Sequence, residues 1–305
     1  MTKSKNRKQV GLYLLFTFVL SWAFMLGVIV PAALKLTPES TDMQRAAVAI
    51  LEAFVMFIPS VGVILTRLVT HDWSDCRLHL NLKGHAVPYL VGWFGPMALT
   101  IVGAVLYFLL FPSQFSLSAA AANPMLGTEA PAALNTVATV VLVLLCPLLN
   151  AINCFGEEWG WRGFLYPKMK EGHSFLRTAV LVGLIWGIWH APIIAIGHNY
   201  QQVVGTSPWW MVLAAIAAMC LFCVFLSILF CYISQQAHSV WPAVLAHGAV
   251  NGVAGIGMLY MADPDHVNAF IGPAPTGIIG ALPLIVAAVW MACRMRREED
   301  KHRAV

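Results

Sequence analysis

Seven polar, ionisable or aromatic side chains lie in three short motifs within long apolar stretches of this 305-residue chain. They are Glu157, Glu158 and Arg162 in the first motif, Trp186 and His190 in the second, and His247 and Asn251 in the third. A carboxylate beside a histidine and a water is suited to general-base catalysis, and histidine and asparagine donors can stabilise an oxyanion. These residue types together indicate hydrolysis of a peptide bond.

Spacing within the motifs favours one shared site. Each motif has two key residues four positions apart, which share a helix face: Glu158 with Arg162, Trp186 with His190, and His247 with Asn251. We expect Glu158 and Arg162 to form a neutralising ion pair, because an unpaired buried charge is costly. This pairing would leave Glu157 without a partner and available as the general base, while His247 and Asn251 supply the oxyanion donors.

The composition is that of a membrane protein. Apolar residues make up 59% of the chain, only 10% of residues are charged, and the mean hydropathy is +0.75. Soluble domains average about 25% charged residues, so a soluble globular protein is excluded, as are disordered, coiled-coil and collagen chains. The basic residues cluster at the ends of apolar runs, which favours contact with the lipid bilayer and gives no reason to expect a nucleic-acid partner.

Eight apolar runs predict the fold class, an all-α polytopic integral membrane bundle of about eight transmembrane helices. We expect no broken helices and a single membrane-embedded domain over residues 1–305, with its motif core at 156–251. The predicted spans are 10–34, 46–69, 86–111, 137–166, 176–196, 208–232, 239–261 and 271–293.

The distribution of basic residues predicts the orientation. With a cytoplasmic amino terminus, fifteen of the 18 Lys and Arg residues lie on the cytoplasmic side, and only Lys35 and Arg45 lie outside. This asymmetry follows the positive-inside rule and places both termini in the cytoplasm. The expected location is the plasma membrane of a bacterial cell.

Depth along the predicted helices supports a common site. At about 1.5 Å per residue from the cytoplasmic ends, Glu157 lies roughly 15 Å deep, His190 roughly 21 Å, and His247 and Asn251 roughly 12 and 18 Å. Such a gathering is also compatible with a polar network that only holds helices together. We interpret the polar turn at His198, Asn199 and Tyr200 as exposed, and the seven cysteines as reduced packing residues.

The three motifs resemble those of the CAAX protease and bacteriocin-processing family of intramembrane proteases, which includes the type II CAAX prenyl endopeptidases. The family pattern EExxxR is similar to Glu157, Glu158 and Arg162, and HxxxN is similar to His247 and Asn251. The pattern FxxxH resembles the segment 186–190, except that Trp186 replaces the usual phenylalanine. We expect this larger ring to narrow the pocket without taking part in the chemistry.

The resemblance implies that Glu157 and His190 activate the water, that His247 and Asn251 bind the oxyanion, and that Glu158 and Arg162 support the site. Family members are often called metalloproteases. Glu157, His190 and His247 would be the ligands if zinc were bound, with an open position for water. We favour a glutamate mechanism without a cofactor, and keep zinc as the alternative.

The predicted function is an intramembrane endopeptidase, a hydrolase acting on a membrane-associated peptide or protein admitted from the cytoplasmic side. A prenylated CAAX protein and a bacteriocin-like peptide are the candidate substrates. The alternatives are a membrane scaffold or immunity protein without enzymatic activity, and a proton-coupled transporter that uses the Glu and His residues.

Overall fold

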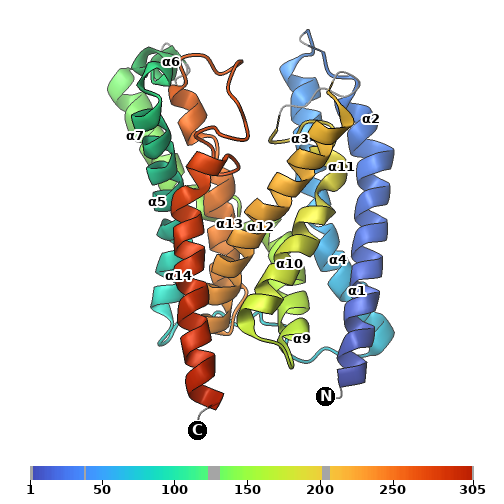
Figure 1. Ribbon diagram of the computed structural model, residues 1–305. Helices are drawn as coiled ribbons and strands as arrows, with labels where there is room; N and C mark the ends of the chain where they lie inside the picture. The colour runs from blue at the N-terminus through green and yellow to red at the C-terminus, as the bar shows by residue number, and fades with distance from the viewer. Residues whose placement is uncertain (1–2, 38, 123–130, 201–206, 304–305) are drawn as a thin grey trace.

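The computed structural model describes residues 3–37, 39–122, 131–200 and 207–303, and this part of the chain is helical, without any named strand (Figure 1). The amino-terminal half contains α1 (Lys3–Phe24), α2 (Val30–Ala33), α3 (Asp42–Val55), α4 (Ile58–Thr70), α5 (Ala86–Leu110), α6 (Leu117–Ala122) and α7 (Ala132–Leu149). The remainder contains α8 (Ala151–Gly160), α9 (Tyr166–Lys170), α10 (Phe175–Trp189), α11 (Ala191–Ile194), α12 (Trp209–Ala237), α13 (Trp241–Val253) and α14 (Ile278–Arg303).

These helices confirm the all-α membrane bundle. Seven helical stretches within the described residues are long and apolar enough to cross a membrane: Lys5–Ala33, Asp42–Thr70, Ala86–Leu110, Ala132–Lys170, Trp209–Ala237, Trp241–Tyr260 and Ile278–Lys301. Their outer faces carry large apolar side chains, such as Ile152 and Leu109, which are 73% and 70% exposed. Exposed apolar surface of this kind matches a lipid environment.

The fifth predicted span differs from expectation. In place of one helix over residues 176–196, α10 has 15 residues and ends at Trp189, where His190 caps it, and Pro192 lies in the first turn of the short α11. Fifteen residues extend only about 22 Å, less than the roughly 30 Å apolar core of a bilayer. The break therefore leaves His190 at a helix end inside the bundle.

Two other spans are interrupted, contrary to the expectation of unbroken helices. The second is divided between α3 and α4 around Met56 and Phe57, with Pro59 in the first turn of α4. The fourth is divided at Asn150 between α7 and α8, and then continues through a π-helical segment, Trp161–Leu165, into α9. Wide π turns are frequent at functional sites, and this one contains Arg162, the last residue of the first motif.

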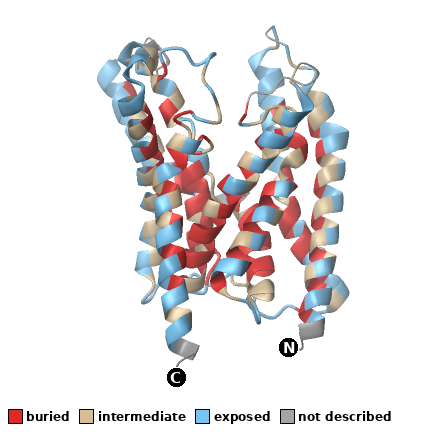
Figure 2. Cartoon of the chain, viewed as in Figure 1, coloured by how far each residue is buried: buried red, intermediate tan, exposed pale blue. Residues whose placement is uncertain are grey.

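The long helix α12 is the central element of the packing. It contacts α10, α13, α14 and α5, and it crosses the view diagonally between the helices drawn on the left and on the right (Figure 1). Buried residues gather around α8, α10, α12 and α13 in the middle of the molecule, whereas α1, α5 and α14 expose their outer faces (Figure 2). Both termini lie at one end, opposite α3, α6 and α11. All seven cysteines are free.

Candidate active site

The three motifs lie on three neighbouring elements of the buried centre. Glu157 and Glu158 are in α8, which packs against α4 and α13, and Arg162 is in the π-helical segment. Gly156 allows the close approach of α8 to the α3–α4 connection, because a Cβ atom there would lie 2.6 Å from the carbonyl oxygen of Met56. Glu157 is 2% exposed, and Glu158 and Arg162 are fully buried.

The Glu157 carboxylate is held by two indole groups. Its Oε2 atom accepts a hydrogen bond from Trp186 Nε1 at 2.6 Å and another from Trp161 Nε1 at 3.2 Å. This corrects the expectation that Glu157 lacks a partner, and it puts Trp186, expected as a supporting residue, in direct contact with the carboxylate. The phenylalanine usual at position 186 could not donate this bond, since it has no N–H group.

Glu158 joins the first motif to the third. Its Oε1 atom accepts from Arg162 Nη1 at 2.9 Å, which confirms the predicted ion pair. The same oxygen lies 2.9 Å from Nδ1 of His247, a contact that spans 89 residues of sequence. The i,i+4 spacing could indicate only the first of these contacts, because the second depends on the packing of α8 against α13.

The Arg162 guanidinium lies between aromatic rings. Its carbon is 4.4 Å from the centre of the Trp186 ring and 5.0 Å from that of Phe230. Within the part of the chain that the structure describes, its Nε and Nη2 atoms have no hydrogen-bond partner, and neither does Oε2 of Glu158. Cation–π attraction therefore supplements a single charged contact in a fully buried pair.

The remaining two motif residues, His190 and Asn251, are positioned by backbone and sulfur contacts. His190 Nδ1 is 2.8 Å from the carbonyl oxygen of Trp186, one helical turn earlier in α10. A carbonyl can only accept, so Nδ1 carries the proton and Nε2 keeps the lone pair in the neutral ring. Asn251 Nδ2 lies 3.7 Å from Cys154 Sγ in α8.

One cavity of about 390 Å³ brings the predicted site residues together. Glu157, His190, His247 and Asn251 all line it, whereas Glu158 and Arg162 lie behind its wall. Asn150 and Asn153 also line the cavity and were not among the predicted site residues, although two polar amides within the predicted apolar span 137–166 were the available signal.

The turn after α11 belongs to this cavity, which corrects its interpretation as a plain exposed turn. His198 and Asn199 line the cavity, and His198 Nδ1 is 3.5 Å from Glu52 Oε1 in α3. Tyr200 is buried and stacks on Phe270.

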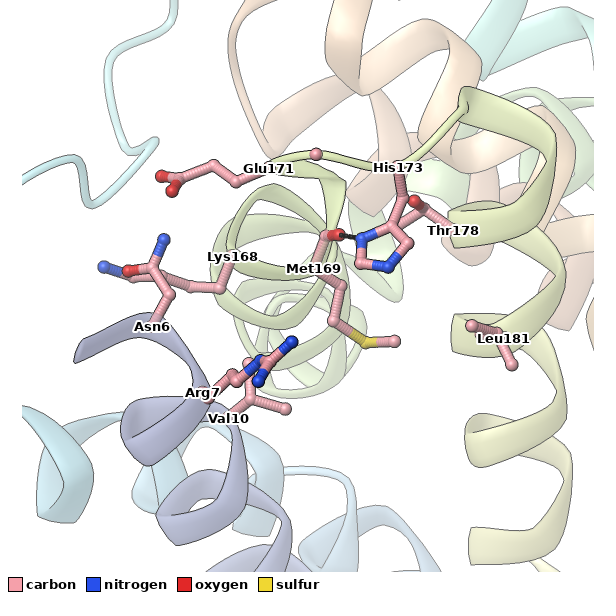
Figure 3. A pocket seen from close by; sticks show the side chains of 10 residues that line it. Asn6, Arg7, Val10, Lys168, Met169, Glu171, His173, Thr178 and Leu181 are labelled. Atoms are coloured by element: carbon pink, nitrogen blue, oxygen red, sulfur yellow. Dashed lines mark hydrogen bonds between the residues drawn. The ribbon is translucent and has the colours of Figure 1, made fainter. Parts of the chain in front are cut away.

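A second cavity, of about 300 Å³, lies near the termini between α1, α9 and α10 (Figure 3). Arg7, Lys168, Met169 and His173 are among its lining residues, and it contains none of the motif residues. This second cavity is therefore not part of the site predicted from the three motifs.

The proposed zinc ligands do not form a metal cluster in this structure. Within the described residues, no group of three or more His, Cys, Asp or Glu side chains is arranged to hold a metal ion. Glu157 Oε2 accepts from two indoles, and Nδ1 of each motif histidine has an oxygen partner. A histidine that binds zinc through Nε2 usually has such a partner at Nδ1, so zinc stays the alternative to the glutamate mechanism.

The fold and the site define a class, the polytopic membrane proteins with a buried Glu–His–Asn centre. Residues 136–253 match the family model described as "Type II CAAX prenyl endopeptidase Rce1-like". CAAX prenyl protease 2 of Methanococcus maripaludis is 33% identical over 55 residues, 18% of this chain and 20% of that protein. The aligned part thus spans about a fifth of this relative's length.

All three motifs fall inside the matched segment 136–253. Both comparisons support the resemblance of this segment to the Rce1-like group of the CAAX protease and bacteriocin-processing family that the motifs indicated.

Proposed function

We propose that this protein is an intramembrane endopeptidase that hydrolyses a peptide bond of a membrane-associated peptide or protein. One observation carries the proposal: Glu157, His190, His247 and Asn251, from three helices, line a single cavity in the buried centre. A network serving only to hold helices together would need no such space, since buried polar groups are normally satisfied by direct contact.

Glu157 is the proposed general base. Its Oε2 atom is held by Trp186 and Trp161, so Oε1 remains to accept a proton from the attacking water. His190 is the proposed second acceptor for this water, because its Nδ1 proton is donated to the Trp186 carbonyl and its Nε2 lone pair is free. The water would then lie between the carboxylate and the imidazole.

Asn251 and His247 are the proposed oxyanion donors. The Asn251 amide can donate to the carbonyl oxygen of the scissile bond as negative charge develops there. His247 donates from Nε2 only as an imidazolium, because its Nδ1 proton is directed at Glu158. The buried Glu158 carboxylate stabilises that cation and fixes the ring, which makes Glu158 a positioning residue.

The glutamate mechanism predicts that metal removal leaves activity intact. Dialysis against a strong zinc chelator should not change the rate of peptide cleavage, and the purified protein should contain no stoichiometric zinc. Loss of cleavage on chelation, with recovery on adding zinc, would contradict the glutamate mechanism and favour the alternative ligand set of Glu157, His190 and His247.

The proposal is tested by comparing peptide termini in membranes from cells that express the wild type or Glu157→Gln at matched levels. We expect new termini only with the wild type, because the amide cannot take the proton from water. Glu171→Gln, at the opposite end of the molecule, is the matched control and should keep the wild-type pattern.

The interrupted helices beside the cavity also suit a proton-coupled transporter. A transporter would show altered flux in Glu157→Gln with identical termini in both samples. A scaffold or immunity protein would tolerate Glu157→Gln without either change, provided that the variant still folds.

A further inference from the structure

The lining of the active-site cavity extends towards one end of the molecule. Glu52 on α3, His198 and Asn199 after α11, and Thr276 before α14 all line it, and Asn199 is exposed. In Figure 1 the helices α3 and α11 lie at the end opposite both termini. A smaller cavity of about 200 Å³ shares Asn199, Ala254 and Thr276 with the first, so the open space continues into the loops at that end.

The other end of the active site is closed by packing. Arg162 and Trp161 are fully buried, Phe164 and Tyr166 are at most 2% exposed, and the Tyr166 hydroxyl donates to Gln235 of α12. The cavity near the termini, seen in Figure 3 beside Arg7 and Lys168, shares no lining residue with the active-site cavity. These two cavities are therefore separate.

Charge distinguishes the two ends. The fifteen Lys and Arg residues assigned to the cytoplasmic side lie in the amino-terminal turns of α1, around residues 67–83, around residues 168–177 and in the last turns of α14. All of these segments are at the end that carries the termini, whereas Lys35 and Arg45 are at the opposite end. Under the positive-inside rule, the end with the termini faces the cytoplasm.

We propose that the active site is entered from the non-cytoplasmic face of the membrane, so that its substrate is a peptide segment presented at the outer surface. This inference rests on the proposed function and names the substrate class for the same site. It replaces the expectation of a cytoplasmic entrance. The termini lie on the cytoplasmic side and the cavity opens at the opposite end, so the entrance faces outward.

The chemistry of the entrance narrows the class further. Among the described residues, no Lys or Arg lines the active-site cavity or the smaller cavity beside it, while Glu52 and Glu157 line the active-site cavity. Acidic groups repel like charge and attract cations, most strongly where water is scarce. The wall also contains Met219, Phe222 and Leu226. A segment with apolar side chains, and without acidic residues near the cleaved bond, is the complementary substrate.

Cysteine labelling tests the side of the entrance without using proteolysis. Thr276→Cys, at the junction of the two cavities, and Ala53→Cys, on the cavity wall, would be treated with a membrane-impermeant maleimide in sealed right-side-out vesicles. His173→Cys, at an exposed residue that lines the cavity near the termini, is the matched control. Labelling is measured as the increase over the unsubstituted chain, which has seven free cysteines of its own.

We expect Thr276→Cys and Ala53→Cys to label in sealed vesicles, and His173→Cys to label only after detergent is added. The reverse pattern, or equal labelling of all three variants in sealed vesicles, would overturn the inference. Labelling of Thr276→Cys without Ala53→Cys would overturn it as well, because the cavity would not be reached from the outer surface.

Two reporters then test the substrate class. The same apolar, non-acidic segment is fused to a single transmembrane helix so that it lies on the outer face in one reporter and on the cytoplasmic face in the other. Cleavage of the outer reporter alone, absent with Glu157→Gln, is the expected result. Cleavage of the inner reporter alone overturns the inference and leaves the proposed function standing. If neither reporter is cleaved, the result counts against the proposed function. The labelling pattern then shows on which side of the membrane the cavity opens.

Discussion

Trp186 connects two parts of the site through one ring. Its indole N–H donates to Glu157, and its face lies 4.4 Å from the Arg162 guanidinium carbon. The side chain therefore orients the proposed base and also contacts the cation that balances Glu158. A phenylalanine would keep the second contact and lose the first, so substitution separates the two roles.

We expect Trp186→Phe to lower kcat by about tenfold to a hundredfold with little change in KM, since a hydrogen bond to a charged group contributes about 1.5–3 kcal/mol. Trp161→Phe removes the longer bond to the same oxygen and should have a smaller effect. Steady-state kinetics on a cleaved reporter checks the order. Equal rates for Trp186→Phe and wild type would show that this indole does not position the base.

The buried charges at Glu158 and Arg162 predict a separation of stability from activity. Glu158→Ala leaves Arg162 buried without a counter-ion, and we expect a loss of about 3–5 kcal/mol of stability. Glu158→Gln combined with Arg162→Met removes both charges and should recover most of that stability. Activity should stay low in the double variant, because His247 still lacks its carboxylate partner.

Thermal unfolding in detergent, measured alongside reporter cleavage, gives both quantities for these variants. A double variant as unstable as Glu158→Ala would mean that the lost carboxylate contact, and not the orphaned charge, causes the instability. A fully active double variant would remove Glu158 from the set of positioning residues.

At the scale of helices, the sequence was sufficient for the bundle and for contacts within one helix. Apolar run length predicted eight spans, and for seven of them the structure has a helical stretch able to cross a membrane. The i,i+4 spacing predicted the Glu158–Arg162 pair. The end of α10 at Trp189, the α7–α8 break and the π-helical segment were not predicted. These features depend on packing against other helices, which residue periodicity does not contain.

The same limit applies to the site. The four cavity-lining motif residues could be chosen from residue type and depth, but the Glu158–His247 contact and the Trp186 donor to Glu157 could not. Both of these contacts depend on which side chain faces a carboxylate across a helix interface. The Trp161 donor to Glu157 has the same i,i+4 spacing as the Glu158–Arg162 pair, so two of the four contacts at the two glutamates became visible only in the assembled bundle.

The close packing of α10 on α12 predicts a position-specific effect of glycine substitution. A Cβ atom at Gly183 would lie 2.5 Å from Val224 Cα and 2.9 Å from the Cys223 carbonyl oxygen. We expect Gly183→Ala to destabilise the protein by about 1–3 kcal/mol, because backbone on α12 cannot yield as a flexible side chain could. Activity should fall with stability, since α10 carries Trp186 and ends at His190.

Gly95→Ala in α5 is the matched control. There a Cβ atom would meet only Val91 Cγ1, at an ordinary 3.6 Å, so a neutral or slightly stabilising effect is expected. Thermal unfolding of the two variants checks the contrast. Equal unfolding temperatures for Gly183→Ala and wild type would show that α10 and α12 can separate without cost.

At the scale of the whole molecule, one carboxylate ties together the end that carries the termini. Asp72, in the loop after α4, accepts from Gln9 of α1 at 2.9 Å and lies 3.3 Å from Lys5 and 3.7 Å from Lys168. Ser74 donates to its other oxygen from both the hydroxyl and the backbone N–H. The first helix, the loop and α9 are thereby held to one another beneath the active site.

These contacts predict a dependence of stability on pH. Hydrogen bonds from Ser74, followed by those from Gln9 and Lys5, hold the pKa of Asp72 well below its usual range, against the opposing effect of burial. A carboxyl with a lowered pKa in the folded state stabilises the protein fully above its unfolded pKa of about 3.9, and this stability is lost as pH falls towards the folded value. Near neutral pH the contribution is complete.

We therefore expect Asp72→Asn to lower the unfolding temperature at pH 7, by the equivalent of about 1.5–3 kcal/mol, and the difference from wild type to shrink below about pH 4. Asp75→Asn, at an exposed carboxylate 3.2 Å from Arg77, is the matched control and should change stability little at either pH. An Asp72→Asn difference of equal size at pH 7 and at about pH 2 would mean that the charge of Asp72 does not hold this end together. The closed, cytoplasmic end inferred for the molecule would then depend on its other contacts, such as those of Arg67 with the carbonyl oxygens of the loop, and Lys5 and Lys168 could be replaced without loosening it.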